Sequence, residues 1–156
     1  MLGAEIDFKY FPTDAFRFGI NATILDPEFD SFTQFPGGDL SGQQPAGISE
    51  LNLSLSAQYD FTLGGNEAFI RGDYQYEDEV QVVDNVAADI ASREVSLLNL
   101  SAGIVTENGF GVTVWGRNIT DDDFLQSAFP SVAQAGSFSG YRNEPRTYGV
   151  TLRKDF

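Results

Sequence analysis

The sequence contains no cysteine and no histidine in its 156 residues. Without cysteine there is no disulfide framework and no thiolate nucleophile. Without histidine, the commonest metal ligand and general base is missing. The sequence also has no nucleophile elbow and no phosphate-binding loop. We therefore do not expect an enzyme, and we expect neither a cofactor nor a bound metal.

Basic residues are scarce. Nine lysines and arginines stand against 23 aspartates and glutamates, and the net charge of −14 argues against binding to nucleic acid. No apolar run approaches the roughly 18 residues of a membrane helix. The first residues, MLGAEIDFKYF, lack a basic segment and carry Glu5 and Asp7 where a signal peptide is apolar, so no signal peptide is expected.

Alternation of apolar and polar residues is the dominant pattern. Between residues 51 and 61, every second residue is Leu, Ala, Tyr or Phe and the residues between them are polar, which predicts a strand with one apolar and one polar face. The pattern recurs and predicts seven strands in all, at about residues 4–10, 16–24, 51–61, 68–76, 98–104, 110–117 and 148–156.

The connections between these segments alternate in length. Short stretches rich in turn residues (PTDA, LGGNE and TENG) are expected to close hairpins. The three other connections are long, at about residues 27–49, 78–93 and 123–143. All tight turns should then lie at one end of an antiparallel sheet, the short-turn end, and all long loops at the other, the long-loop end. Such regularity is typical of a transmembrane β-barrel with periplasmic turns and extracellular loops.

Aromatic residues on the apolar face gather near the two ends of the predicted strands. Tyr74 and Tyr76 lie toward the long-loop end. At the short-turn end the pattern places Phe8, Tyr10, Phe16, Tyr59, Phe61, Phe110 and Phe156. Two such rows are typical of the aromatic girdles that lie at membrane interfaces.

The last part of the chain carries two motifs, within VWGRNITDDDFLQ and GYRNEPRTYGVTLRKDF. Residues 114–156 resemble the carboxyl end of TonB-dependent outer-membrane receptors. In that family an Asn-aliphatic-Thr-Asp motif closes the next-to-last strand, and a Glu-Pro-Arg-x-Tyr-Gly-aliphatic motif opens the last. The matching residues here are Asn118, Ile119, Thr120, Asp121, Glu144, Pro145, Arg146, Tyr148, Gly149 and Val150.

The resemblance also explains the terminal strand, whose alternating residues and final aromatic look like the signal read by the barrel-assembly machinery. The residues that fit this signal are Tyr148, Val150, Leu152 and Phe156. Lys154 departs from it, because an aromatic or apolar residue is usual there. A lysine near the interface is expected to extend its ammonium toward the headgroups.

By resemblance, residues 1–156 are the carboxyl-terminal portion of a 22-strand barrel that surrounds a plug domain. We expect the plug domain and the signal peptide to be absent from this chain. The complete receptor would lie in the outer membrane of a Gram-negative bacterium, in contact with its lipid. It would take up a scarce solute such as a siderophore, a cobalamin or an oligosaccharide, with TonB acting through the missing plug.

Two alternatives remain open at this stage. A soluble all-β binding module would bury the same apolar faces in a core, and a small eight-strand outer-membrane protein would need one more strand. Two local hypotheses concern side chains: Glu144 and Arg146 pair to anchor the last strand, and Trp115 either packs on a neighbour or stacks on a ligand. The acidic runs at 77–79 and 121–123 are interpreted as solvated strand and loop ends.

Overall fold

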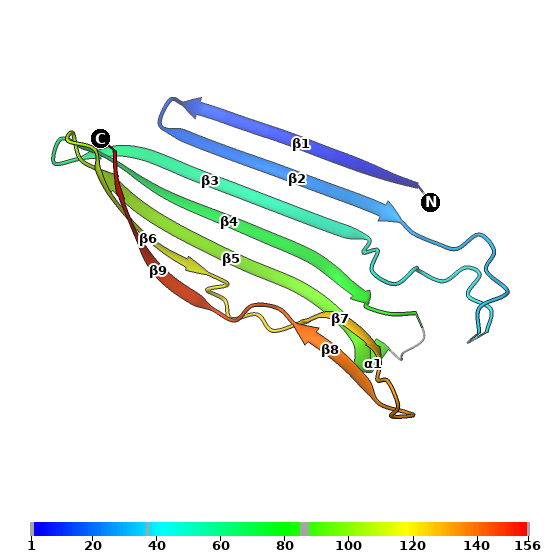
Figure 1. Ribbon diagram of the computed structural model, residues 1–156. Helices are drawn as coiled ribbons and strands as arrows, with labels where there is room; N and C mark the ends of the chain where they lie inside the picture. The colour runs from blue at the N-terminus through cyan, green and yellow to red at the C-terminus, as the bar shows by residue number, and fades with distance from the viewer. Residues whose placement is uncertain (1, 37, 85–87, 156) are drawn as a thin grey trace.

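The computed structural model describes residues 2–36, 38–84 and 88–155 (Figure 1). These ranges contain nine strands and one helical turn. Their bounds are β1 Leu2–Thr13, β2 Phe16–Asp26, β3 Leu51–Leu63, β4 Asn66–Gln81, α1 Ala88–Ala91, β5 Ser92–Val105, β6 Phe110–Arg117, β7 Leu125–Pro130, β8 Phe138–Arg142 and β9 Thr147–Lys154.

Seven of the strands form one antiparallel sheet in the order β1-β2-β3-β4-β5-β6-β9. The prediction of an all-β chain with seven alternating strands is confirmed. Figure 1 shows the tight turns together at one end of this sheet and the longer connections at the other, as the connection lengths predicted. Positive φ angles at Gly64, Gly65 and Gly109 form two of these turns.

The prediction is partly wrong for two of the three long loops. Residues 123–143 contain a second hairpin, in which β7 pairs with β8 outside the main sheet. Its strands have six and five residues, and Ser, Ala and Gly interrupt their apolar pattern. The middle connection is shorter than predicted, because β4 continues to Gln81 and β5 starts at Ser92.

The register keeps like residues together on each face of the sheet. On one face, Leu55 lies between Ile20 of β2 and Tyr74 of β4. One residue further, Ser56 lies between Gly19 and Asp73 on the opposite face. We call these the apolar and the polar face. Because side chains alternate strictly along each strand, this separation into two faces extends over the whole sheet.

Aromatic rings on the apolar face stack in pairs toward the short-turn end. The ring centroids of Phe8 and Tyr10 are 6.2 Å apart, and those of Tyr59 and Phe61 are 5.9 Å apart. Phe16 pairs with Tyr59 across strands β2 and β3. The predicted aromatic row at this end is therefore present among the described residues, and Phe156 lies outside them.

The sheet is a single layer, and the described residues build almost no core. The buried hydrophobic core among them consists of five residues: Leu40, Ala68, Val80, Ala91 and Val95. On the apolar face of β9, Tyr148, Val150 and Leu152 are 63–68% exposed. The accessible surface of 10410 Å² compares with about 7,700 Å² for a compact monomer of 17.1 kDa. The apolar face is thus left without a covering layer within the described chain.

Strands β1 and β9 lie at the two edges of the sheet and do not pair with each other, so the described strands form an open sheet rather than a closed barrel. Each edge leaves a row of backbone N–H and C=O groups without a strand partner. Among the described helical residues, none forms a helix long and apolar enough to cross a membrane.

Trp115 packs on the neighbouring strand. A side chain at Gly149 would overlap its indole ring, so the glycine lets the ring lie flat on β9. The indole Nε1 donates to Thr151 Oγ1 at 3.2 Å, and the guanidinium of Arg117 lies 5.1 Å from the ring centroid. Of the two hypotheses for Trp115, the structure supports packing.

We expect Gly149→Ala to destabilise the β6–β9 pairing by about 1–3 kcal/mol, because the added methyl group forces the Trp115 ring out of its place. Gly111→Ala on the same strand pair is the matched control, since the nearest atoms lie 3.7 Å from the position that its methyl group would take. Urea unfolding followed by fluorescence of the single tryptophan measures both. Equal stability of the two variants would contradict the packing.

Candidate functional site

The structure gathers the two sequence motifs into one junction at the end of β6. Asn118 follows β6 and is only 5% exposed. Its φ of 48° and that of Asp121 at 60° turn the chain sharply there. Asparagine and aspartate tolerate this left-handed conformation better than other side chains do. After this turn, Ile119 and Thr120 lie against β5.

The side chain of Asn118 lies at the centre of this junction. Its Nδ2 donates to the carbonyl oxygens of Asp122 at 2.8 Å and of Glu144 at 3.2 Å. Its Oδ1 accepts from the backbone N–H of Asp122 at 2.9 Å, and its own N–H donates to Asn99 Oδ1 at 2.9 Å. The side-chain amide thus connects the turn after β6 to the segment that leads into β9, and the backbone N–H of the same residue connects them to β5.

The rest of the first motif fastens the junction to β5. The N–H of Ile119 donates to the carbonyl of Leu98 at 2.9 Å. Thr120 Oγ1 donates to the carbonyl of Ser96 at 3.0 Å, and the N–H of Ser96 donates to Asp122 Oδ2 at 2.7 Å. The motif therefore continues the edge of β5 where β6 has ended.

The second motif, with Asn143 directly before it, reaches the same place from the other side. The Nδ2 of Asn143 donates to the carbonyl of Asp122 at 2.9 Å, and its Oδ1 accepts from the N–H of Phe124 at 2.9 Å. The hypothesis of a Glu144–Arg146 pair is wrong: Arg146 pairs with Asp121 at 3.1 Å. The sharp turn at Asp121 brings its carboxylate to the start of β9, while Glu144 contributes its carbonyl oxygen.

Pro145 precedes β9, at a point where the edge strand needs no N–H. Beyond it, Tyr148, Val150 and Leu152 share one face of β9. Phe156, the fourth residue of that signal, lies outside the described residues. The ammonium of Lys154 donates to the carbonyl of Asn108 in the β5–β6 turn, so it closes the short-turn end of the strand.

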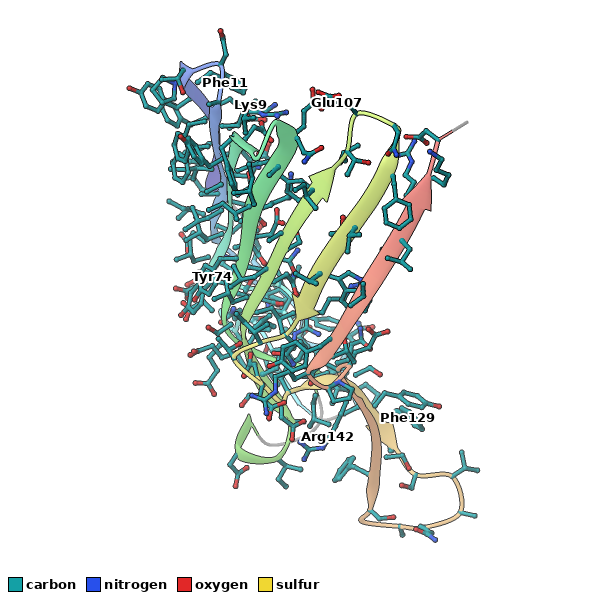
Figure 2. All side chains as sticks on the ribbon, turned by 90° about the vertical axis from the view of Figure 1, so that its left-hand side faces the viewer. Lys9, Phe11, Tyr74, Glu107, Phe129 and Arg142 are labelled. Atoms are coloured by element: carbon teal, nitrogen blue, oxygen red, sulfur yellow. The ribbon has the colours of Figure 1, made fainter. Side chains whose placement is uncertain are left out.

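The β7–β8 hairpin projects from the junction beyond the end of the sheet, as Figure 2 shows with Phe129 and Arg142 labelled. An ion pair between Asp123 and Arg142 closes its base. Hydrogen bonding from this guanidinium lowers the pKa of the Asp123 carboxyl below its usual range. Near the middle of the hairpin, the rings of Phe129 and Tyr141 are 5.9 Å apart.

A ladder of charged and amide side chains crosses the polar face from β2 to β4. Arg17 pairs with Asp60, which also accepts from Gln58 Nε2 at 2.8 Å. Arg71 donates to Gln58 Oε1 at 3.4 Å and to both carboxylate oxygens of Asp73. Opposite charges therefore alternate along the ladder, so the face is polar but locally neutral here.

The loop between β2 and β3 is folded on itself. The ring centroids of Phe29 and Phe32 are 5.0 Å apart and those of Phe32 and Phe35 are 5.7 Å apart. Backbone bonds from Leu40 to Phe32 and from Gly42 to Phe29 close the loop. Its aromatic residues thus contact each other.

The acidic side chains of the described residues do not gather around a common point. Among these residues, no group of three or more acidic side chains is placed to hold a metal ion. The three carboxylates of the acidic run at 121–123 have different partners. Asp121 pairs with Arg146, Asp122 accepts from the backbone N–H of Ser96, and Asp123 pairs with Arg142.

Comparison of the chain with family models, with curated proteins and with solved structures finds no match. The geometry of the sheet and of the junction, together with the sequence pattern, is therefore what bears on function.

We expect Asn118→Ala to release the β7–β8 hairpin and the start of β9, because it removes four side-chain hydrogen bonds and places an alanine at positive φ. At about 1 kcal/mol for each bond, the loss is about 2–4 kcal/mol. Asn118→Gly separates the two causes, since it keeps the φ and loses only the bonds. Amide hydrogen exchange in residues 118–147 measures the release, and unchanged protection in both variants would refute the role of Asn118.

The pair of Asp123 and Arg142 predicts a dependence on pH. Because the pKa of Asp123 is lowered in the folded chain, its contribution is present above the unfolded value of about 4 and is lost as the pH falls through the lowered value. Hairpin amides should therefore lose protection below about pH 4 after correction for intrinsic exchange. The loss should be smaller in Asp123→Asn, and an identical pH profile would contradict the assignment.

Proposed function

We propose that residues 1–156 are the carboxyl-terminal part of the β-barrel of a TonB-dependent outer-membrane receptor. The single observation that carries the proposal is the single-layer sheet, whose apolar face has no covering layer among the described residues. In a membrane barrel that face contacts lipid, and the polar face lines a wet interior. A water-soluble sheet of this size requires a second layer on its apolar side.

The aromatic rings support the same orientation. The stacked pairs Phe8–Tyr10 and Tyr59–Phe61 lie on the apolar face toward the short turns. Amphipathic rings at such positions lie at the level of lipid headgroups. On the polar face, the ladder from Arg17 to Asp73 suits a hydrated lumen, where charged side chains keep their water.

The strand lengths also fit a bilayer. A tilted transmembrane strand needs about 9–11 residues. Strands β1 to β5 have 12, 11, 13, 16 and 14 residues. Strands β6 and β9 are shorter, with eight residues each, and the Asn118 junction continues the wall at their long-loop end.

The open edges of β1 and β9 require further strands in a membrane. Each unpaired backbone group in lipid costs several kcal/mol, so the only stable sheet is a closed one. We propose that additional strands complete a barrel of the 22-strand class around a plug. Its outer loops and plug bind a siderophore, a cobalamin or an oligosaccharide, and TonB then moves the plug from the inner membrane side.

Within this proposal the described residues supply wall, outer loops and assembly signal. Tyr148, Val150 and Leu152 form an apolar row on β9, and together with the terminal aromatic of the sequence they make up the signal that the assembly machinery recognises. The junction around Asn118 holds the last outer loop, which contains the β7–β8 hairpin, against the wall. The segment contributes structure and recognition rather than catalysis.

A second candidate, a soluble all-β binding module, is favoured by one observation. The apolar face carries a hollow of about 1140 Å³. Its floor is formed by small residues on neighbouring strands, Ala57, Gly72, Ala102 and Gly116. In a soluble module a bound apolar ligand or a second layer of the protein fills such a hollow.

Fractionation of the native cells tests the proposal. An antibody against residues 142–156 should detect a band several times heavier than 17.1 kDa in the outer membrane, resistant to extraction with alkali. A heat-modifiable band of 17.1 kDa in that fraction would mean a small barrel of its own. A signal confined to the soluble fraction would overturn the membrane proposal and favour the binding module.

A further inference from the structure

Arg117, the last residue of β6, is the one arginine that forms no ion pair within the described ranges. Acidic residues outnumber basic ones by 23 to 9 in the chain, so an unpaired arginine is the less expected arrangement. Each of the other arginines has a carboxylate partner. These pairs are Arg17–Asp60, Arg71–Asp73, Arg93–Glu77, Arg142–Asp123, Arg146–Asp121 and Arg153–Asp155.

The acidic run that follows Arg117 most closely in the sequence does not supply a partner. Asp121 and Asp123 pair with other arginines, and Asp122 accepts from the backbone N–H of Ser96. The carboxylates of residues 121–123 therefore have their partners elsewhere, and the charge of Arg117 is left without one in the described chain.

The side chain of Arg117 is held by an aromatic ring instead of a carboxylate. Trp115 lies on the polar face, where β6 places it between Ser101 of β5 and Gly149 of β9. Its indole ring is fixed by close contact with Gly149 and by the hydrogen bond to Thr151, and the Arg117 guanidinium lies over this ring at 5.1 Å from the centroid. The cation–π contact positions the charge without a carboxylate, so the N–H donors of the guanidinium remain available to a further acceptor.

The chemistry of the guanidinium indicates what kind of acceptor fits. Its planar fork matches the two oxygens of a carboxylate in a bidentate pair. Phosphate groups also match this fork, but the chain's net charge of −14 repels a doubly charged anion more strongly than a singly charged one. The indole ring beside the guanidinium offers carbon surface to the rest of the ligand. A monocarboxylate on a planar organic group satisfies both parts of this surface.

We propose that Arg117, held over the Trp115 ring, binds the carboxylate of an organic solute at the polar face of the sheet. The inference rests on the proposed function for its role, since that face then lines the interior through which a solute passes. It narrows the solutes of the receptor to those that carry a carboxylate. Arg117 lies at the long-loop end of β6, next to the Asn118 junction, so a solute that enters from the outer loops meets it early.

The test uses the complete protein, produced with 5-fluorotryptophan and purified from the cell fraction in which it accumulates. The fluorine resonance of Trp115 is assigned by its loss in Trp115→Phe. Benzoate, the probe, should shift this resonance saturably, because its carboxylate pairs with the guanidinium over the ring. Benzamide has nearly the same shape and no charge, and it should leave the resonance in place.

Arg117→Gln should weaken benzoate binding by about tenfold or more, because it removes a charge-assisted pair. Arg153→Gln is the matched control, since it removes the same charge from the polar face at the short-turn end of β9, and it should leave the affinity within about twofold. Arg117→Lys keeps the charge and loses the planar fork, so it should weaken binding by a smaller factor, about threefold. Urea unfolding verifies that the variants fold, and the lysine variant carries the test if the glutamine variant does not.

Four results would overturn the inference: no saturable shift with benzoate, an equal shift with benzamide, equal affinity in Arg117→Lys and the unaltered protein, or equal weakening by Arg117→Gln and Arg153→Gln. Tighter binding of phenyl phosphate than of benzoate would overturn the assignment to carboxylates. The fraction in which the protein accumulates reports independently on the membrane proposal, so the failure of one is distinguishable from the failure of the other.

Discussion

The uncovered apolar face of the seven-stranded sheet is the constraint on which the rest of the structure depends. Burial of apolar area, at about 25 cal/mol per Å², is the main stabilising term of a folded chain. Here the alternating residues of every strand place that area on one side of a single layer, and the described chain provides nothing to cover it. Lipid outside a barrel resolves the constraint without a second layer, and this is the physical ground of the membrane proposal.

The Asn118 junction is needed because β6 stops short of the long-loop end of the sheet, which the first residues of β5 reach. One buried amide bonds the turn after β6 and the approach to β9, while Thr120 and Asp122 continue along β5. Strand β9 and the segment that contains the β7–β8 hairpin are thereby held by the same few atoms. The motif that ends β6 therefore also holds the sheet and the β7–β8 hairpin together.

Alternation was sufficient to predict the seven strands. A strand with one apolar face has a period of two, as in residues 51–61, whether protein or lipid covers that face. It was not sufficient for β7 and β8, whose Ser, Ala and Gly residues carry too little apolar contrast. The partner of Arg146 was missed because the positive φ of Asp121 brings a distant carboxylate close.

The membrane proposal is tested most directly by labelling single cysteines along β3, which is possible because the chain has none of its own. Leu53→Cys and Leu55→Cys lie on the apolar face, and Ser54→Cys and Ser56→Cys lie between them on the polar face. In native membranes, a water-soluble maleimide should modify the two polar-face positions and spare the two apolar ones, which a lipid-soluble maleimide should reach. Protection of the apolar positions from both reagents would mean that protein, and not lipid, covers this face, and would contradict the account.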